Sequence, residues 1–514
     1  MYSNISKSGS VLILFTLSMA VAIAQPNDIT IANSCIPCSE IKDLHLPDVT
    51  ILEATEVNTE SAELKTSDKA HCKILGRIGK EIHFELLLPV EWNGRFAMGG
   101  GGGFVGTIQN MARYTINQGF ATAGTDTGHK ANGIKADWAL NNMERQLNFG
   151  HMAIHRTAEV SKVLIFNFYC ADPEYSYFIG CSRGGGQAMM EAQRYPEDFD
   201  GILAMAPAFD WTAFAAEFIQ NSKALYPDPQ NLESPELTKE NQMLLQEAVL
   251  NACDEIDGLK DGLITDPRNC DFNPENLPVC PDGTPGDNCF TEEQIQVIKT
   301  IYAGVTIDGK EVYPGFPLGG ENRGGGWNNW IVGPEASLKP LGFPSLQFGF
   351  GTEVFKYLVF NDPDWDYSTY NFENFFSDTQ YAASYLNANN PDYSAYKKSG
   401  GKILFAHGWE DAALSALATI DHFESILQAN PDADDFTKLY LLPGVLHCGD
   451  GPGPDQVDWL NVIRAWVEKG EAPGKLVVNK TQKGKVVLSR PIFPYPRTAV
   501  YDGKGDPNQE SSFK

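Results

Sequence analysis

Short apolar runs alternate with helical stretches between Ile82 and Pro207, and this alternation limits the fold more than any other feature of the sequence. It is typical of an α/β domain in which helices cover both faces of a parallel sheet. The pattern stops near Phe209 and resumes at Lys402. The predicted strands are Ile82–Leu88, Arg95–Met98, Ala121–Thr125, Tyr175–Gly180, Gly201–Ala206, Lys402–Ala406 and Lys438–Leu442.

The stretch between the two α/β parts is rich in Asn, Asp, Gly, Pro and aromatic residues. The sequence therefore predicts one α/β domain, built from residues 25–208 and 399–514, that is interrupted by an inserted domain at residues 209–398. Near the C-terminus, apolar residues recur at helical spacing and predict a helix that packs on the sheet; they are Trp459, Val462, Ile463, Trp466 and Val467.

The N-terminus has the pattern of a secretory signal peptide. Lys7 precedes an apolar run from Val11 to Ala24, and small residues stand just before Gln25. The run is shorter than the roughly 18 residues that span a bilayer, so we expect residues 1–24 to be removed and the protein to be secreted, extracellular or periplasmic, without a membrane partner. A formal charge of −27 argues against a nucleic-acid partner as well.

Secretion favours disulfide bonds among the ten cysteines. Proximity in the sequence suggests two pairs, Cys253 with Cys270 and Cys280 with Cys289. We favour a bond between Cys72 and one member of the CxxC formed by Cys35 and Cys38, while the partner of Cys170 stays open at this point.

The segment Gly180-Cys181-Ser182-Arg183-Gly184 matches G-x-S-x-G and stands between a predicted strand and a predicted helix. That context is the one the nucleophile elbow requires. Glycines flank the serine where the strained turn needs them, and Ser182 would lie at the positive end of a helix dipole. The sequence therefore predicts Ser182 as a nucleophile. The alternative is a glycine-rich turn whose serine caps the helix.

A catalytic serine needs a base and an orienting carboxylate, in the chain order Ser, Asp or Glu, His. Asp411 and His447 each follow a predicted strand end, where open α/β sheets place their sites. We predict these two as acid and base, and we interpret His407 as a structural residue at a strand end. The other candidates are His129 for the base and Glu410 and Asp450 for the acid.

An oxyanion hole needs two donors. The backbone amide of Arg183, which follows the nucleophile, is the first candidate. Five consecutive glycines from Gly99 to Gly103 follow an early strand, and we expect Gly101 or Gly102 to supply the second amide. The alternative is a flexible loop without a catalytic role.

Cys181 precedes the serine and Cys448 follows the histidine, so a disulfide can bridge the two loops of a triad. Together with Asp411, this set resembles the tannase and feruloyl esterase family, which includes the mono(2-hydroxyethyl) terephthalate hydrolase. Further segments look like family landmarks: Thr125–His129, Tyr177–Ser182, Glu191–Gly201 and Pro443–Gly444. The resemblance implies an α/β-hydrolase fold with a large lid domain at residues 209–398. Arg183 and Gly186 depart from the family, which commonly has a threonine or an acid at the first position and often an arginine at the second.

The segment Cys253–Leu263 presents three aspartates among glycines. Hard oxygen ligands of this kind suit Ca²⁺, although the spacing is not that of an EF-hand. A solvated acidic loop is the alternative, and the resemblance favours calcium because the family carries a structural calcium in its lid. The expected ligands are the carboxylates of Asp254, Asp257 and Asp261 and the carbonyls of Leu259 and Leu263.

These features predict a serine carboxylic-ester hydrolase that works through an acyl-enzyme, without an organic cofactor. By resemblance, the substrate is a small aromatic ester of the feruloyl or galloyl type. The alternatives are a terephthalate monoester hydrolase of the same family, a peptidase that uses the same triad, and a non-catalytic secreted binding protein on the same fold.

Overall fold

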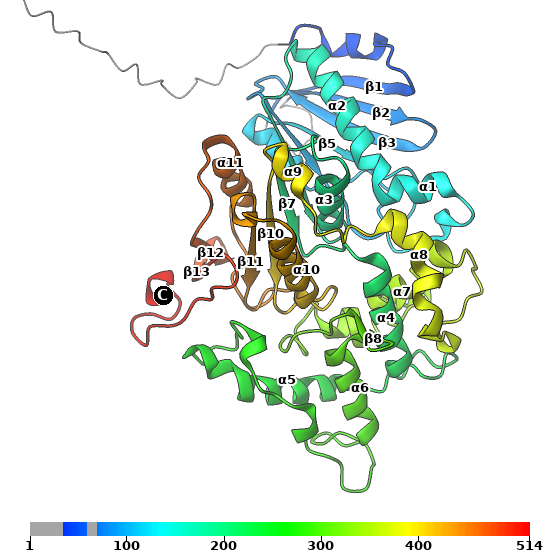
Figure 1. The fold of residues 1–514 in the computed structure, drawn as a ribbon, viewed down its shortest axis with the longest axis vertical. Helices are drawn as coiled ribbons and strands as arrows, with labels where there is room; N and C mark the ends of the chain where they lie inside the picture. The colour runs from blue at the N-terminus through cyan, green and yellow to red at the C-terminus, as the bar shows by residue number, and fades with distance from the viewer. Residues whose placement is uncertain (1–33, 59–68) are drawn as a thin grey trace, which may run out of the picture.

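The computed structural model describes residues 34–58 and 69–514, so the expected signal peptide at residues 1–24 lies outside the described residues. A nine-stranded sheet in the order β1-β2-β3-β5-β4-β6-β7-β10-β11 forms its centre (Figure 1). The strands are β1 (Val49–Val57), β2 (His71–Ile78), β3 (Ile82–Pro89), β4 (Arg95–Gly99), β5 (Ala121–Thr125), β6 (Tyr175–Cys181), β7 (Gly201–Met205), β10 (Lys402–Gly408) and β11 (Thr437–Leu442).

The sheet is mixed, and this corrects the prediction of a parallel sheet at its N-terminal edge. β3, predicted as a parallel strand, runs antiparallel to β2 and to β5, and β1 runs antiparallel to β2. From β5 through β4, β6, β7, β10 and β11 all pairings are parallel. β1 is mostly exposed, so its sequence lacks the apolar run that identified the buried strands.

Side chains alternate between two apolar layers along the central strands, as the two-residue period of a strand requires. In β6, Phe178 belongs to the larger core, whereas Tyr177 and Ile179 belong to the smaller one. The smaller core includes Trp459, Leu460, Ile463 and Trp466 of α11 (Trp459–Lys469), which confirms the predicted C-terminal helix. The larger core includes residues of α2 (Ala153–Tyr169), α3 (Arg183–Arg194) and α10 (Ala416–Ala429).

Residues between β7 and β10 are all described, and none of them joins the nine-stranded sheet. We call residues 209–398 the insert; most of it lies below the sheet in the view of Figure 1. Its elements are α4 (Trp211–Leu225), α5 (Lys239–Cys253), α6 (Glu292–Ala303), β8 (Val305–Ile307), β9 (Lys310–Tyr313), α7 (Leu346–Glu353), α8 (Phe375–Leu386) and α9 (Ser394–Lys398).

The remaining elements are the short helix α1 (Met143–Leu147) and the C-terminal hairpin of β12 (Leu476–Gln482) and β13 (Lys485–Ile492), which the sequence analysis did not predict. Among the described helices, none is both long enough and apolar enough to cross a bilayer. All ten cysteines lie in the described residues and are paired, as Cys35–Cys170, Cys38–Cys72, Cys181–Cys448, Cys253–Cys270 and Cys280–Cys289.

Candidate active site

Ser182 occupies a sharp turn between β6 and α3. Its backbone adopts φ 60° and ψ −123°, in the positive-φ region that non-glycine residues rarely enter. A Cβ atom on Gly180 would lie 2.1 Å from the carbonyl oxygen of Gly184, and one on Gly186 would lie 1.9 Å from that of Ala208. The turn therefore holds its serine in a strained conformation that depends on glycine at neighbouring positions.

Asp411 and His447 meet where β10 and β11 end. His447 Nδ1 lies 2.7 Å from Asp411 Oδ2, and the backbone amides of Ala413 and Leu414 donate to Asp411 Oδ1 at 2.8 and 3.0 Å. Burial alone would raise the pKa of Asp411, but the two histidines that contact it hold the pKa well below its ordinary value. Asp411 is thus an ionised partner that fixes the orientation of the His447 ring.

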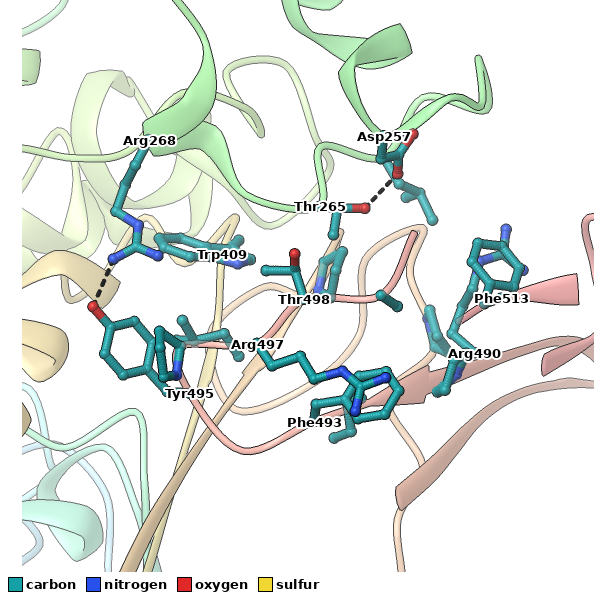
Figure 2. Close-up of a pocket in the computed structure, with 18 of the residues that line it drawn as sticks. Asp257, Thr265, Arg268, Trp409, Arg490, Phe493, Tyr495, Arg497, Thr498 and Phe513 are labelled. Carbon is teal, nitrogen blue, oxygen red and sulfur yellow. Dashed lines mark hydrogen bonds between the residues drawn. The ribbon is translucent and has the colours of Figure 1, made fainter. Parts of the chain in front are cut away.

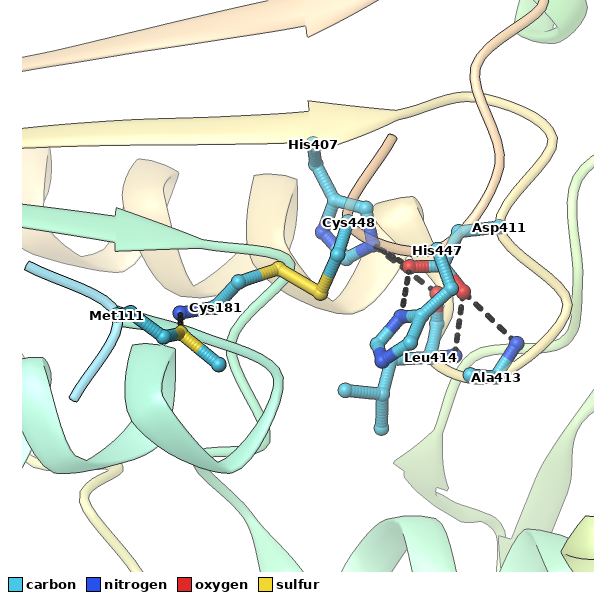
Figure 3. The surroundings of a disulfide bond; sticks show 8 residues. All are labelled: Met111, Cys181, His407, Asp411, Ala413, Leu414, His447 and Cys448. Carbon is cyan, nitrogen blue, oxygen red and sulfur yellow. Dashed lines mark hydrogen bonds and ion pairs between the residues drawn. A yellow bond between two sulfur atoms is a disulfide. The ribbon is translucent and has the colours of Figure 1, made fainter. Parts of the chain in front are cut away.

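His407 is the second histidine on this carboxylate (Figure 3). Its Nε2 lies 3.1 Å from Asp411 Oδ2, and its Nδ1 lies 2.8 Å from the hydroxyl of Thr419. The ring is 1% exposed, in keeping with a structural residue at a strand end. The other candidates for the base and the acid do not contact Asp411 or His447 through a hydrogen bond. His129 is buried and stacks on Trp138, Glu410 pairs with Arg323, and Asp450 is exposed.

The disulfide Cys181–Cys448 joins the residue before Ser182 to the residue after His447, with the two Cα atoms 5.9 Å apart (Figure 3). The bond closes a sequence separation of 267 residues. It holds the loop after β11 against the elbow after β6, so the serine and the histidine are fixed to one another covalently.

A cavity of about 290 Å³ opens beside Ser182, and both Ser182 and His447 line it. Its walls are mostly aromatic and aliphatic. Trp330 of the insert packs edge-on against the His447 ring, with ring centroids 5.1 Å apart, and stacks on Phe350. The cavity is further lined by Gly102, Gly103, Met111, Arg183, Ala208, Trp211, Phe214, Phe218, Ala413, Leu414 and Cys448. No single insert residue could be assigned to this cavity from the sequence, and the aromatic content of residues 209–398 was the signal that pointed to the insert.

The expected oxyanion-hole donors differ in whether their backbone amides are free and whether they line the cavity. Arg183 is the first residue of α3, so its amide has no acceptor within the helix. Gly102 lines the cavity, but its amide donates to Gln109 Oε1 at 2.8 Å. The Gly101 amide donates to Gln187 Oε1 at 3.2 Å, and Gly101 does not line the cavity. Gly102 is therefore the better placed of the two predicted glycines.

The side chain of Arg183 is buried without a carboxylate partner. Its Nη2 donates to the carbonyl oxygens of Phe149 and Gly150, while Nε and Nη1 have no partner among the described atoms. The guanidinium carbon lies 4.4 Å from the Phe149 ring centroid and 5.3 Å from that of Trp211. Burial lowers the pKa of Arg183 to about 9.

The acidic loop predicted to bind calcium lies beside a small pocket between the insert and the C-terminal segment (Figure 2). Asp254 accepts the amides of Asp261 and Gly262, Asp257 accepts the Thr265 hydroxyl, and Asp261 pairs with Arg490. Burial raises the pKa of Asp257 and of Asp261; repulsion from Asp254 adds to the first shift, and repulsion from Asp257 adds to the second. The oxygen donors are of the kind that Ca²⁺ prefers, but Asp254, Asp257 and Asp261 do not form a group whose carboxylate oxygens all lie within 4.8 Å of one another.

Comparison with known proteins gives concordant results. The model of the family described as tannase and feruloyl esterase matches residues 68–514. A mono(2-hydroxyethyl) terephthalate hydrolase of Piscinibacter sakaiensis is 30% identical over 86% of this chain and 84% of its own. A probable feruloyl esterase of Arthroderma benhamiae is 32% identical over 90% and 86%. The crystal structure of feruloyl esterase B from Aspergillus oryzae superposes with a TM-score of 0.82 at 26% identity and covers 93% of this chain and 99% of that one.

Proposed function

The chain belongs to the tannase and feruloyl esterase family, and from this premise we propose that it is a secreted serine carboxylic-ester hydrolase that acts on aromatic esters. The observation that carries the proposal is the cavity beside Ser182, which is lined by both Ser182 and His447 and walled by aromatic side chains. The 2.7 Å contact between His447 and Asp411 completes the set of groups that acyl transfer needs.

In the proposed reaction, His447 takes the proton of Ser182 as the serine oxygen attacks the ester carbonyl. Asp411 holds the His447 tautomer through Nδ1, which leaves Nε2 for the proton transfer. The backbone amides of Arg183 and Gly102 stabilise the tetrahedral oxyanion. The Gly102 amide gives up its hydrogen bond to Gln109 and donates to the oxyanion instead. His447 then gives the proton of Ser182 to the leaving alcohol, whose loss leaves an acyl-enzyme. Water hydrolyses the acyl-enzyme with neutral His447 again as the base, which releases the acid and restores Ser182.

The acyl group of the substrate is proposed to be aromatic, such as a feruloyl or galloyl group. Trp211, Phe214, Trp330 and Phe350 supply faces and edges on which such a ring packs. We infer that the insert acts as a lid, because five of its aromatic side chains line the cavity while the nucleophile and base come from the α/β domain. This division supports residues 25–208 and 399–514 as the catalytic domain and residues 209–398 as the lid.

A terephthalate monoester is the second candidate substrate. The relative from Piscinibacter sakaiensis bears the name of a hydrolase for such an ester. Its free carboxylate needs a cation, and Arg183 is a buried guanidinium without a carboxylate partner at the cavity wall. A non-catalytic binding protein would need the cavity but would gain nothing from an ionised acid behind His447.

Two further properties are proposed with the activity. The five disulfides support secretion into an oxidising compartment. The carboxylates of Asp254, Asp257 and Asp261 and the carbonyls of Leu259 and Leu263 would hold a structural Ca²⁺, which would supply the positive charge that these carboxylates share. Chelation should then lower the thermal unfolding midpoint of the parent protein. The midpoint of Asp257→Asn should be lower than that of the untreated parent and should not change when chelator is added.

The test incubates the purified mature protein with methyl ferulate, methyl gallate and a terephthalate monoester and measures the released acid. Ser182→Ala, assayed in parallel, should lose release from whichever ester the parent hydrolyses. Release by Ser182→Ala at the parent rate contradicts the proposed nucleophile. A folded, calcium-loaded protein that is silent on all three esters favours the binding protein.

A further inference from the structure

A cluster outside the cavity contains a buried carboxyl group for which the esterase chemistry has no use. Glu191 lies in α3, is 1% exposed, and both of its carboxylate oxygens are buried without a hydrogen-bond partner among the described residues. An ionised carboxylate in such a place is costly unless a cation compensates it.

Two other metal-binding side chains face Glu191. One nitrogen of His155 and one carboxylate oxygen each of Glu191 and Asp198 lie within 4.8 Å of one another. Within residues 34–58 and 69–514, this is the one group of three such side chains that meets that separation. His155 Nδ1 already lies 2.7 Å from Asp198 Oδ2. Because two carboxyl groups this close cannot both be ionised alone, they share either a proton or a cation.

We propose that His155, Glu191 and Asp198 form a binding site for a divalent transition-metal ion, with Zn²⁺ as its preferred occupant. One imidazole nitrogen and two carboxylate oxygens make a donor set that zinc accepts, and water completes a tetrahedral site with three protein ligands. The imidazole disfavours Ca²⁺ and Mg²⁺, which select oxygen ligands. The site is therefore distinct in chemistry from the acidic loop of the insert.

The surroundings of the cluster favour a bound metal ion over neutralisation by a lysine side chain. The Lys162 ammonium is a nearby positive charge, but it donates to the backbone carbonyl of Asp198. The His155 ring stacks on Tyr195 with centroids 3.8 Å apart, which fixes its plane. The His155 side chain is 21% exposed and gives an ion a route from solvent.

The ion would join three separate elements behind the nucleophile. His155 lies in α2, Glu191 lies in α3, and Asp198 lies in the turn that leads to β7. Glu191 follows Arg183 by eight residues of α3, which is about 12 Å along the helix axis. At that distance the ion takes no part in ester cleavage, and its effect is to fix the helix that carries the elbow.

The test uses tag-free, chelator-treated full-length mature protein in a buffer with excess Ca²⁺, so that the acidic loop of the insert does not compete for zinc. Isothermal titration with Zn²⁺ should show one ion per chain. His155→Gln and Glu191→Gln should each weaken binding by more than about 100-fold, because each removes one ligand of three. Glu159→Gln is the graded comparison: Glu159 Oε2 lies 3.4 Å from His155 Nε2 on the exposed side and is not a ligand, so its replacement should weaken zinc binding less than the loss of either ligand.

Thermal unfolding supplies a second measurement. Zinc should raise the unfolding midpoint of the parent and of Glu159→Gln but not that of His155→Gln. Should Glu191→Gln fail to fold, the partly exposed His155→Gln carries the test. The proposal is overturned if the parent binds no zinc with a dissociation constant below about 1 mM, or if both ligand variants bind zinc as the parent does. Either result means that Glu191 and Asp198 share a proton.

Discussion

Replacement of Trp330 by leucine tests whether the acyl group is an aromatic ring held in the cavity. Trp330 lines the cavity and packs edge-on against His447. Leucine keeps the wall apolar but removes the indole face. An aromatic pair contributes about 0.5 to 1.5 kcal/mol beyond area burial. We therefore expect kcat/KM for methyl ferulate to fall about 2- to 13-fold more than kcat/KM for methyl butyrate.

The ratio of the two esters is the informative quantity in this experiment. Any displacement of His447 by the Trp330 substitution slows both esters equally and cancels in the ratio. Trp365→Leu is the matched control, because Trp365 lies in the same insert and packs on Phe355 and Phe360 but does not line the cavity. Equal losses on the ferulate and the butyrate ester in Trp330→Leu would refute the placement of the acyl ring against Trp330.

Three further substitutions test other parts of the site. His407→Phe removes a donor from the triad carboxylate and should lower kcat/KM by up to about 100-fold; an unchanged value contradicts the contact. Burial raises the pKa of Glu410 from 4.5 to about 7, so the unfolding free energy should fall by about 3 kcal/mol as pH rises between those values. In Glu410→Gln, the unfolding free energy measured by urea titration should depend less on pH over this range. The same pH dependence in the variant and the parent would contradict the prediction. Gly186→Ala should cost about 1 to 3 kcal/mol because its Cβ meets backbone, whereas Gly474→Ala, with open space around it, should cost almost nothing; equal unfolding midpoints would argue against the clash.

The sequence predicted β3 and the parallel strands well, but it missed β1 and β2 at the antiparallel edge of the sheet. Ala121–Thr125 is found with the predicted bounds, and the other predicted strands differ from β3, β4, β6, β7, β10 and β11 by one or two residues at an end. These strands are buried on both faces and therefore appear as continuous apolar runs. β1 is mostly exposed, most residues of β12 are half-buried, and β13 is exposed at its start and buried at its end, so none of the three strands is buried along its whole length.

Some site residues can be identified from a short segment of sequence, whereas others reach the site only through long-range folding. Ser182, Asp411 and His447 stand at strand ends, and a strand end can be located from its own short segment. Trp330 and Phe350 reach the cavity only through the folding of the insert, and no local pattern assigns them to it. The occupation of the Gly101 and Gly102 amides by glutamine side chains likewise depends on contacts that sequence spacing does not encode.

The pairing of β10 with β7 also has a consequence for the order in which the protein can fold. These neighbours are separated by the whole insert, so the parallel register between them forms only after almost two hundred residues have been synthesised and looped out. Cys181 cannot form its final disulfide until Cys448 has been synthesised, and Cys170 and Cys253 lie nearer to it in the chain. Cys448 is the last cysteine in the chain, so the disulfide that joins the Ser182 loop to the His447 loop can form only after every other cysteine has been synthesised.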